Sequence, residues 1–412
     1  MVLQFSYGLV YTFGNLLPYL ASYLRWKVDP QLNDGSLIWF QSFLAGFPFA
    51  FLVGAYLEKL IGARWGAALG SFLYTGGLAL SYLSIQKSYF SLWLPHRVGL
   101  VSGLITAGFG SGAFLISPIQ TKFINPNNFN VDANGYFTQE ELLERVPKMF
   151  LLLAFIFGTL QFFALIFIGD PPQEMLLKNE SEEENARIDP RILEHRLSMA
   201  SCVSYTSTIH YNAPTHSKSA ILCSDTFFFI FVTLMLNDIW VQTISGFYKA
   251  YGQTFIHDDF FLATINAFAA VFNTISRISW GAIADKFSYQ LSMSIACTFG
   301  AVLMWTLGLV KLSGSPALYF VWICAMFCCV GATFSLVPYA AHRCFGSDNF
   351  GFSYGCLQMA MFAAGIFNAL ASQFLLNIIG FQIHFTFIGF TMFMSLLLTI
   401  FVSRTQFGQL AI

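Results

Sequence analysis

Residues 260–286 read FFLATINAFAAVFNTISRISWGAIADK, a largely apolar run that is long enough to cross a bilayer and holds one internal cation, Arg277. A cation inside a membrane helix costs about 2.5–3.5 kcal/mol on insertion scales, so such a residue usually has a function. One interpretation is that Arg277 binds an anion. The other is that its side chain snorkels to the membrane surface beside Asp285 and Lys286. The spacing alone does not choose between them.

The composition of the whole chain predicts a polytopic membrane protein. Its 412 residues are 56% hydrophobic and 10% charged, whereas soluble domains carry about 25% charged residues. The net charge of −1 gives no reason to expect a nucleic-acid partner. The cysteines fall largely in apolar runs and lack the spacing of metal ligands, so we interpret them as packing residues and expect no cofactor.

Apolar segments close to the ~20 residues that a bilayer requires predict an all-α fold. The first begins almost directly after Met1 and is predicted to be a transmembrane helix rather than a cleaved signal. The eleven predicted spans lie at about 2–24, 36–57, 65–85, 98–119, 149–169, 226–248, 259–282, 289–310, 317–340, 350–378 and 384–403.

A polar and charged stretch divides these spans into two groups. Residues 170–225 combine a cluster of Glu and Arg with a tail rich in Ser, Thr and His, which is typical of a solvated linker. We therefore expect an N-terminal transmembrane bundle at 1–169, a cytoplasmic linker at 170–225 and a C-terminal transmembrane bundle at 226–412.

The two groups carry the same motif at the end of a span: Gly, three residues, an acid and Lys. Its occurrence at corresponding places favours a duplicated bundle, as in many secondary transporters. The motif residues are Gly54, Glu58, Lys59 and Arg64 in the first half, and Gly281, Asp285 and Lys286 in the second.

The duplication also predicts a missing helix. Lys286 and Arg343 are 57 residues apart and enclose two spans, whereas Lys59 and Arg97 are 38 residues apart and enclose one. The difference of 19 residues is about the length of one spanning helix. We therefore expect the fourth helix of the first bundle to be absent near residues 86–93, as in a splice form or an incomplete gene model.

Together with the paired motifs, four further stretches resemble one transporter family: YTFGNLLPYL at 11–20, WLPHRVGLVSG at 93–103, AGFGSG at 107–112 and YKAYG at 248–252. The chain resembles the major facilitator superfamily and, within it, the oxalate:formate antiporter and monocarboxylate transporter branch. The resemblance implies a fold of two pseudo-symmetric helix bundles with 12 helices in all. It also implies that the glycine, acid and base motifs gate the bundles, beside the simpler role of orienting the chain by charge.

The same resemblance implies that Arg277 binds the substrate carboxylate. Antiporter members add a Lys at the place of Met361, and proton-coupled monocarboxylate carriers place an Asp where this chain has Asn273. One cation balances one carboxylate, so a monocarboxylate is favoured over a dicarboxylate.

Polar residues inside other spans are further candidates for the binding site. Asp238 and its neighbour Asn237 lie within an apolar span, where an ionisable group pairs with Arg277, carries a proton or fixes helix packing. Tyr7, Tyr11 and Asn15 share one helix face and either bind the carboxylate or pack between helices. Gln358 is a candidate of the same kind.

One loop follows the order of oxygen ligands in a calcium-binding loop, with Gly135 at the sixth position. Pro126 argues against the helix that normally precedes such a loop, and an acidic loop without metal is the alternative. The ligand positions are Asn130, Asp132, Asn134, Thr138 and Glu141.

We expect a secondary active or facilitative transporter of small organic anions, chiefly monocarboxylates, working by alternating access. Dicarboxylate exchange and amino acids are the alternative substrates, and protons are a candidate co-substrate. No nucleophile with a base and an orienting group is visible, so an enzyme is not expected. The expected location is the plasma membrane, with an organelle membrane as the alternative. A form without transport activity, acting through an ancillary membrane protein, is the other functional hypothesis.

Overall fold

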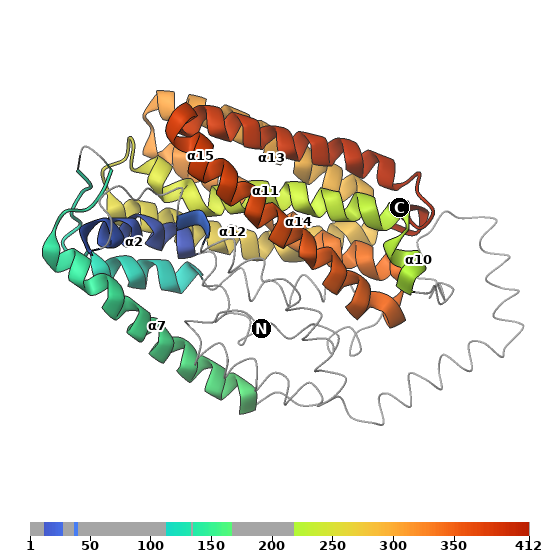
Figure 1. Cartoon of the computed structure of the whole chain (residues 1–412), viewed down its shortest axis with the longest axis horizontal. Coiled ribbons are helices and arrows are strands. Elements are labelled where there is room, and N and C mark those ends of the chain that lie inside the picture. The colour runs from blue at the N-terminus through green and yellow to red at the C-terminus, as the bar shows by residue number, and fades with distance from the viewer. Residues whose placement is uncertain (1–11, 28–36, 40–112, 133–134, 167–217, 412) are drawn as a thin grey trace, which may run out of the picture.

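The regular secondary structure of the described residues is helical throughout, with no strand among them (Figure 1). The computed structural model of the chain describes residues 12–27, 37–39, 113–132, 135–166 and 218–411. The predicted span at 65–85, most of the span at 36–57, the gap near 86–93 and most of the linker lie outside these residues.

The six spans predicted between residues 226 and 403 are confirmed, because six helices there are long and apolar enough to cross a membrane. Several extend beyond the predicted ends, since polar residues such as Asp225 and Lys286 continue a helix past its apolar middle. The C-terminal helices are α10 (Lys218–Leu222), α11 (Asp225–Gly252), α12 (Asp259–Lys286), α13 (Tyr289–Ser313), α14 (Pro316–Phe345), α15 (Ser347–Val402) and η3 (Gly408–Ala411).

Local sequence signals set the ends of these helices. Side-chain oxygens cap the first turns of α11 to α14, each accepting a backbone N–H three residues later. The capping residues are Ser224, Asp258, Ser288 and Ser315. Gly314 ends α13 at φ 62°, and Gly380 at φ 71° breaks α15 into two spans, both in the left-handed region that favours glycine.

The described N-terminal part consists of α2 (Phe13–Lys27), helical residues 113–124 and α7 (Glu140–Ile166). The predicted span at 149–169 falls largely within α7, which begins nine residues earlier with charged turns that a search for apolar segments passes over. The helix bends by 40° between Glu140–Val146 and Leu151–Phe163.

Two apolar clusters hold these helices together. The larger one joins α11 to α15 and includes Phe13 and Leu17 of α2. The smaller one joins α2, residues 113–124 and α7 around Tyr19 and Phe137. Large side chains such as Phe299, which is 61% exposed, cover the outer surface of the bundle, as expected where helices face lipid.

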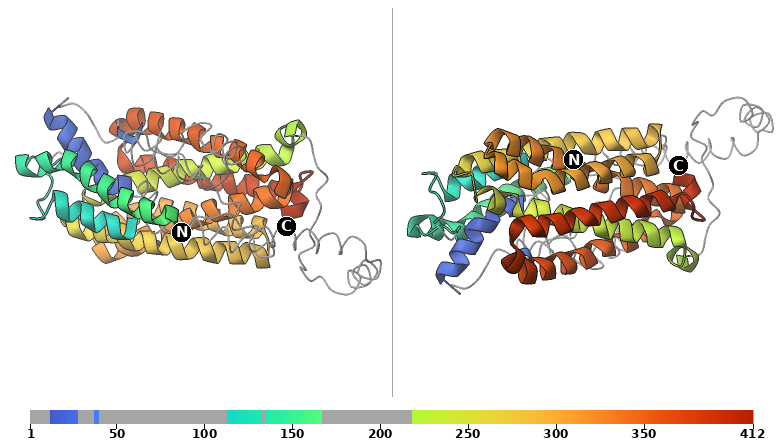
Figure 2. Two further views of the ribbon diagram at one scale, coloured as in Figure 1. Left: turned by 90° about the horizontal axis from the view of Figure 1, so that it is seen from below. Right: turned by 90° about the horizontal axis from the view of Figure 1, so that it is seen from above.

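α2 joins the two parts by packing against α11, with a smaller contact on α12 (Figures 1 and 2). The contact is so close that a Cβ atom at Gly14 would lie 2.0 Å from the carbonyl oxygen of Ser245, so only glycine fits there. We call the end of the bundle where α11 begins, next to the linker, the linker end. The opposite end, with the loop 253–258 between α11 and α12, is the far end.

Candidate functional site

Arg277 lies inside the C-terminal bundle with 1% of its surface exposed. Its Nε donates a hydrogen bond to Oδ1 of Asn273 at 3.0 Å, one turn earlier on α12. Its guanidinium carbon lies 4.8 Å from the ring centre of Phe334 on α14, a cation–π distance. The side chain therefore lies away from Asp285 and Lys286, which disfavours the snorkelling interpretation.

Asn273 presents a hydrogen-bond donor next to this guanidinium. The residue is fully buried, and among the described residues no acceptor reaches its Nδ2. A buried donor without a partner is costly, so a polar atom from another source is expected to meet it. Arg277 and Asn273 together offer donors to an anion with more than one oxygen.

Tyr354 and Gln358 of α15 form a polar pair of their own. Gln358 donates a hydrogen bond to the hydroxyl of Tyr354 through Nε2. The Oε1 of Gln358 has no partner within the described part of the chain. The role of Gln358 in substrate binding stays a prediction.

Asp238 has other neighbours. Its Oδ2 accepts a hydrogen bond from Nε2 of Gln242 at 2.5 Å, and the same nitrogen lies 3.5 Å from the carbonyl oxygen of Met361. Asn237 contacts α13, with Nδ2 3.4 Å from the sulfur of Met293. The carboxylate of Asp238 is therefore bonded to Gln242 rather than to Arg277, and a pair between Asp238 and Arg277 is not formed in this structure.

The second gating motif lies at the linker end of α12. Gly281 is buried, Asp285 is half-buried and Lys286 is exposed on the last turn. The matching residues of the first motif, Gly54, Glu58, Lys59 and Arg64, lie outside the described residues, as do Tyr7 and Tyr11. The structure leaves the gating role of these motifs as a prediction.

The candidate calcium loop is only partly described, because Asn134 lies outside the described residues. Asp132 Oδ1 accepts the backbone N–H of Tyr136 at 2.9 Å, and Glu141 forms an ion pair with Arg145. Within the described ranges, no group of three or more His, Cys, Asp or Glu could hold a metal. The other two candidate ligands, Asn130 and Thr138, are not of these residue types and add none to such a group. The geometry favours an acidic loop that closes on itself.

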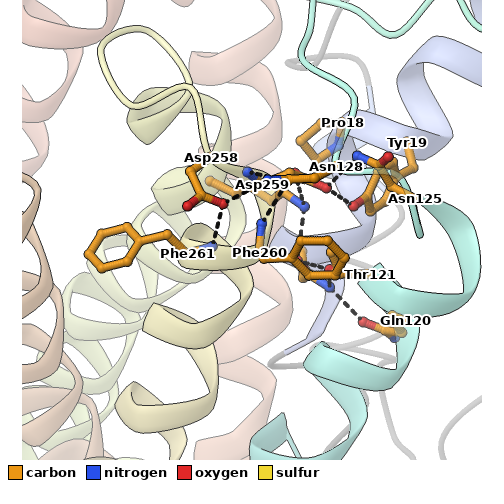
Figure 3. A network of polar contacts seen from close by, with 12 residues as sticks. Pro18, Tyr19, Gln120, Thr121, Asn125, Asn128, Asp258, Asp259, Phe260 and Phe261 are labelled. Carbon is orange, nitrogen blue, oxygen red and sulfur yellow. Dashed lines mark hydrogen bonds and ion pairs between the residues drawn. The ribbon is translucent and has the colours of Figure 1, made fainter.

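At the far end, the structure reveals a buried ion pair between Lys249 and Asp259, with Nζ and Oδ1 2.7 Å apart. Asp259 also accepts hydrogen bonds from Tyr19 and, at 3.0 Å, from Nδ2 of Asn125 (Figure 3). Lys249 donates to Oδ1 of Asn15 at 3.0 Å and lies 4.2 Å from the ring centre of Tyr19. We call these five residues the far-end network.

The far-end network contains residues that the sequence did not single out. The predicted span ended at 248, which placed Lys249 at the membrane surface, whereas α11 continues to Gly252. A second buried cation could have been found by extending that span. Asn15, a candidate for the carboxylate site, is bonded instead to Lys249 and to the N-terminal helix at 113–124, with Nδ2 3.1 Å from Gln120.

A family model described as Major Facilitator Superfamily matches residues 82–345 of the chain. Apicoplast pyruvate carrier 1 of Toxoplasma gondii is 27% identical over 326 residues, which cover 74% of this chain and 58% of the relative. Apicoplast pyruvate carrier 2 of the same organism is 20% identical over 497 residues, covering 88% and 75%. The chain thus spans less than two thirds of the first of these relatives.

The fold also matches solved transporter structures. The proton:xylose symporter XylE bound to 6-bromo-6-deoxy-D-glucose superposes with a TM-score of 0.60 over 98% of this chain and 97% of that chain. The sequences are 14% identical, so this likeness concerns the fold alone. All-helical architecture, apolar spans and the matching family model agree with one another.

Proposed function

The chain belongs to the Major Facilitator Superfamily and is a multi-pass membrane transporter, and on that premise we propose that it carries small monocarboxylates. The substrate would bind between the two bundles, which then alternate in opening toward each side of the membrane. We propose that the carrier lies in the plasma membrane, with an organelle membrane as the alternative. Localisation of a tagged chain would distinguish the two membranes.

Buried Arg277, with its guanidinium oriented by Asn273, is the observation that carries this proposal. A planar guanidinium offers paired donors that match the two oxygens of a carboxylate. Holding this group inside the protein is costly unless it serves recognition or structure. Its charge selects an anion, and its geometry selects a carboxylate.

Asn273 supports a substrate with a further oxygen close to the carboxylate. Its buried Nδ2 would donate to a carbonyl or hydroxyl oxygen on the neighbouring carbon, while Arg277 holds the carboxylate. Pyruvate has this arrangement, and the two Toxoplasma gondii relatives are pyruvate carriers by name. Pyruvate is therefore the first substrate to test.

Met361 supports one carboxylate rather than two. It is buried beside α11 at the place where the antiporter branch is expected to carry a second cation. A thioether cannot balance the charge of a second carboxylate. Dicarboxylates and amino acids are thus the weaker candidates, and both belong in the same assay as competitors.

Uptake of labelled pyruvate into proteoliposomes tests the proposal. Arg277→Gln should reduce uptake by about 100-fold or more, because it removes a charged partner of the substrate. Arg404→Gln, which removes an exposed cation beyond α15, is the matched control and should retain uptake. Normal pyruvate uptake by folded Arg277→Gln would refute the proposed site.

The alternative is a form of the chain that does not transport. It is favoured by the expected loss of a span near residues 86–93, which lies outside the described residues. The wild-type chain distinguishes the two functions: a folded protein that carries none of the tested anions, with or without a proton gradient, would favour the non-transporting form.

A further inference from the structure

We propose that the far-end network is a gate that closes the path between the two bundles at the end opposite the linker. The far-end network lies away from the substrate site. Its role as a gate rests on the proposed transport function, because only a transporter needs a gate. It differs from the gating motifs predicted from the sequence, because the second of those motifs lies at the linker end of α12. The network supplies a separate closure at the far end.

The charges and their partners come from opposite bundles. Lys249 lies in the last turn of α11 and Asp259 begins α12, so the ion pair belongs to the C-terminal bundle. Tyr19 and Asn15 come from α2, and Asn125 follows the N-terminal helix 113–124. Separation of the bundles would leave the ion pair intact and remove its partners from α2 and Asn125.

Neighbouring contacts extend the closure across the far end. Asn128 Oδ1 accepts the backbone N–H groups of Asp259 and Phe260 at 3.1 and 3.2 Å, capping the start of α12 from the other bundle (Figure 3). Nearer the middle of the helices, Asn266 donates to Ser117 at 2.6 Å. These bonds join the same two bundles as the far-end network.

A second contact joins the described N-terminal part to another helix of the C-terminal bundle. Trp39 of the N-terminal part donates through Nε1 to Oε1 of Gln373 near the far end of the first span of α15, at 2.7 Å. The far end is therefore tied by α2 against α11 and α12, and again by residues 37–39 against α15.

Among the described residues, the cavity beside the network is too small for an organic anion. The cavity next to Asp259, lined also by Gln253, Ile256 and Leu262, holds about 10 Å³, roughly the volume of one water. Next to the network, α2 and α11 approach each other closely at Gly14 and Ser245. Opening at this end requires the two bundles to move apart.

The polar character of the network makes this closure reversible. A buried ion pair is costly to desolvate and depends on all its hydrogen bonds being made. When the bundles part, water replaces Tyr19, Asn15 and Asn125 around Lys249 and Asp259. A small change in the number of these bonds therefore shifts the population of the closed state.

A cysteine placed behind the network tests this gate without reference to any substrate. Ser117 is fully buried and lies on the central side of Asn125 in the helix 113–124. In sealed vesicles, a membrane-impermeant thiol reagent is added to the face opposite the linker, whose side is established by proteolysis. Labelling of Ser117→Cys is measured against the same chain without this substitution, which accounts for the native cysteines. Every further variant carries Ser117→Cys as well, so the loss of the Asn266–Ser117 bond is common to all of them.

Tyr19→Phe should raise the labelling rate by about tenfold, because one hydrogen bond to a carboxylate holds the bundles less tightly without it. Tyr23→Phe, one turn further along α2, is the matched control, since the contact described for Tyr23 is a ring packing against Trp26. Asp259→Asn should raise labelling further by leaving Lys249 without its charge partner.

Unchanged labelling in Tyr19→Phe, or an equal rise in Tyr23→Phe, would overturn the gate. Asp259→Asn could misfold, so the milder variant Tyr19→Phe is the deciding test of the gate. Thermal unfolding of each variant shows whether it is folded. The hypotheses of the gate and of the substrate site are tested independently. Labelling still tests the gate if Arg277→Gln leaves pyruvate uptake unchanged and so refutes the substrate site.

Discussion

At the scale of single residues, two buried cations of the C-terminal bundle have different partners. Lys249 lies 2.7 Å from a carboxylate of its own bundle and holds α2 through Asn15. Arg277 is oriented by the neutral amide of Asn273. A cation paired to a carboxylate attracts an external anion weakly, so Lys249 is the weaker candidate for binding one.

Asn273→Ala should therefore reduce pyruvate uptake by about 10- to 100-fold, since a hydrogen bond to a charged group contributes about 1.5–3 kcal/mol. Thr274→Ala, at the next position of α12, is the control, because the hydroxyl of Thr274 bonds the carbonyl oxygen of Ala270 in its own helix at 2.8 Å. Initial rates in proteoliposomes provide the measurement. Equal rates in the two variants would exclude Asn273 from the site.

At the scale of helices, the crossing of α12 and α14 positions Arg277. Gly331 of α14 faces Ser276 and the backbone of α12, and a Cβ atom there would lie 2.0 Å from the hydroxyl oxygen of Ser276. Phe334, one turn further along α14, packs on the guanidinium of Arg277. The close approach of the two helices thus places the aromatic ring beside the cation.

Gly331→Ala should destabilise the protein by about 1–3 kcal/mol, the usual cost of overpacking, and should lower uptake by shifting α12 against α14. Thermal unfolding and uptake are measured together. The double variant Ser276→Ala with Gly331→Ala removes the clashing hydroxyl and should recover part of both losses. If the double variant is no better than Gly331→Ala alone, the clash with Ser276 is not the cause.

At the scale of the whole molecule, the far end is where the described parts of the two bundles meet. α2 and residues 113–128 contact α11 and α12 there, while residues 40–112 of the first bundle lie outside the described residues. Each span carries the chain across the membrane once, so a missing span in the first bundle would change the side on which neighbouring segments lie. The predicted gap near 86–93 therefore concerns the topology of the entire transporter.

We expect the genomic sequence between the codons for Gln86 and Trp93 to contain an exon for about 20–40 mostly apolar residues. A chain with this insertion should carry pyruvate faster than the shorter chain in the same proteoliposomes, because its first bundle would have the full number of helices. Genomic sequencing and a side-by-side flux assay provide the measurements. Uninterrupted coding sequence at this point would contradict the missing helix.

The sequence by itself determined the elements of the C-terminal half. Apolar runs located the six spans, and the lone cation Arg277 within one of them marked a candidate site. These features depend on residues within a few turns of one another, so their pattern is visible along the chain.

Only the tertiary structure decided that Lys249 and Asp259 share a buried network with α2. Asn15 is 234 residues from Lys249, and Tyr19 is 240 residues from Asp259. Residues at the ends of helices are ordinarily solvated at the membrane surface, and they become buried only where another bundle covers them. That covering depends on how the two bundles pack, which no local spacing encodes.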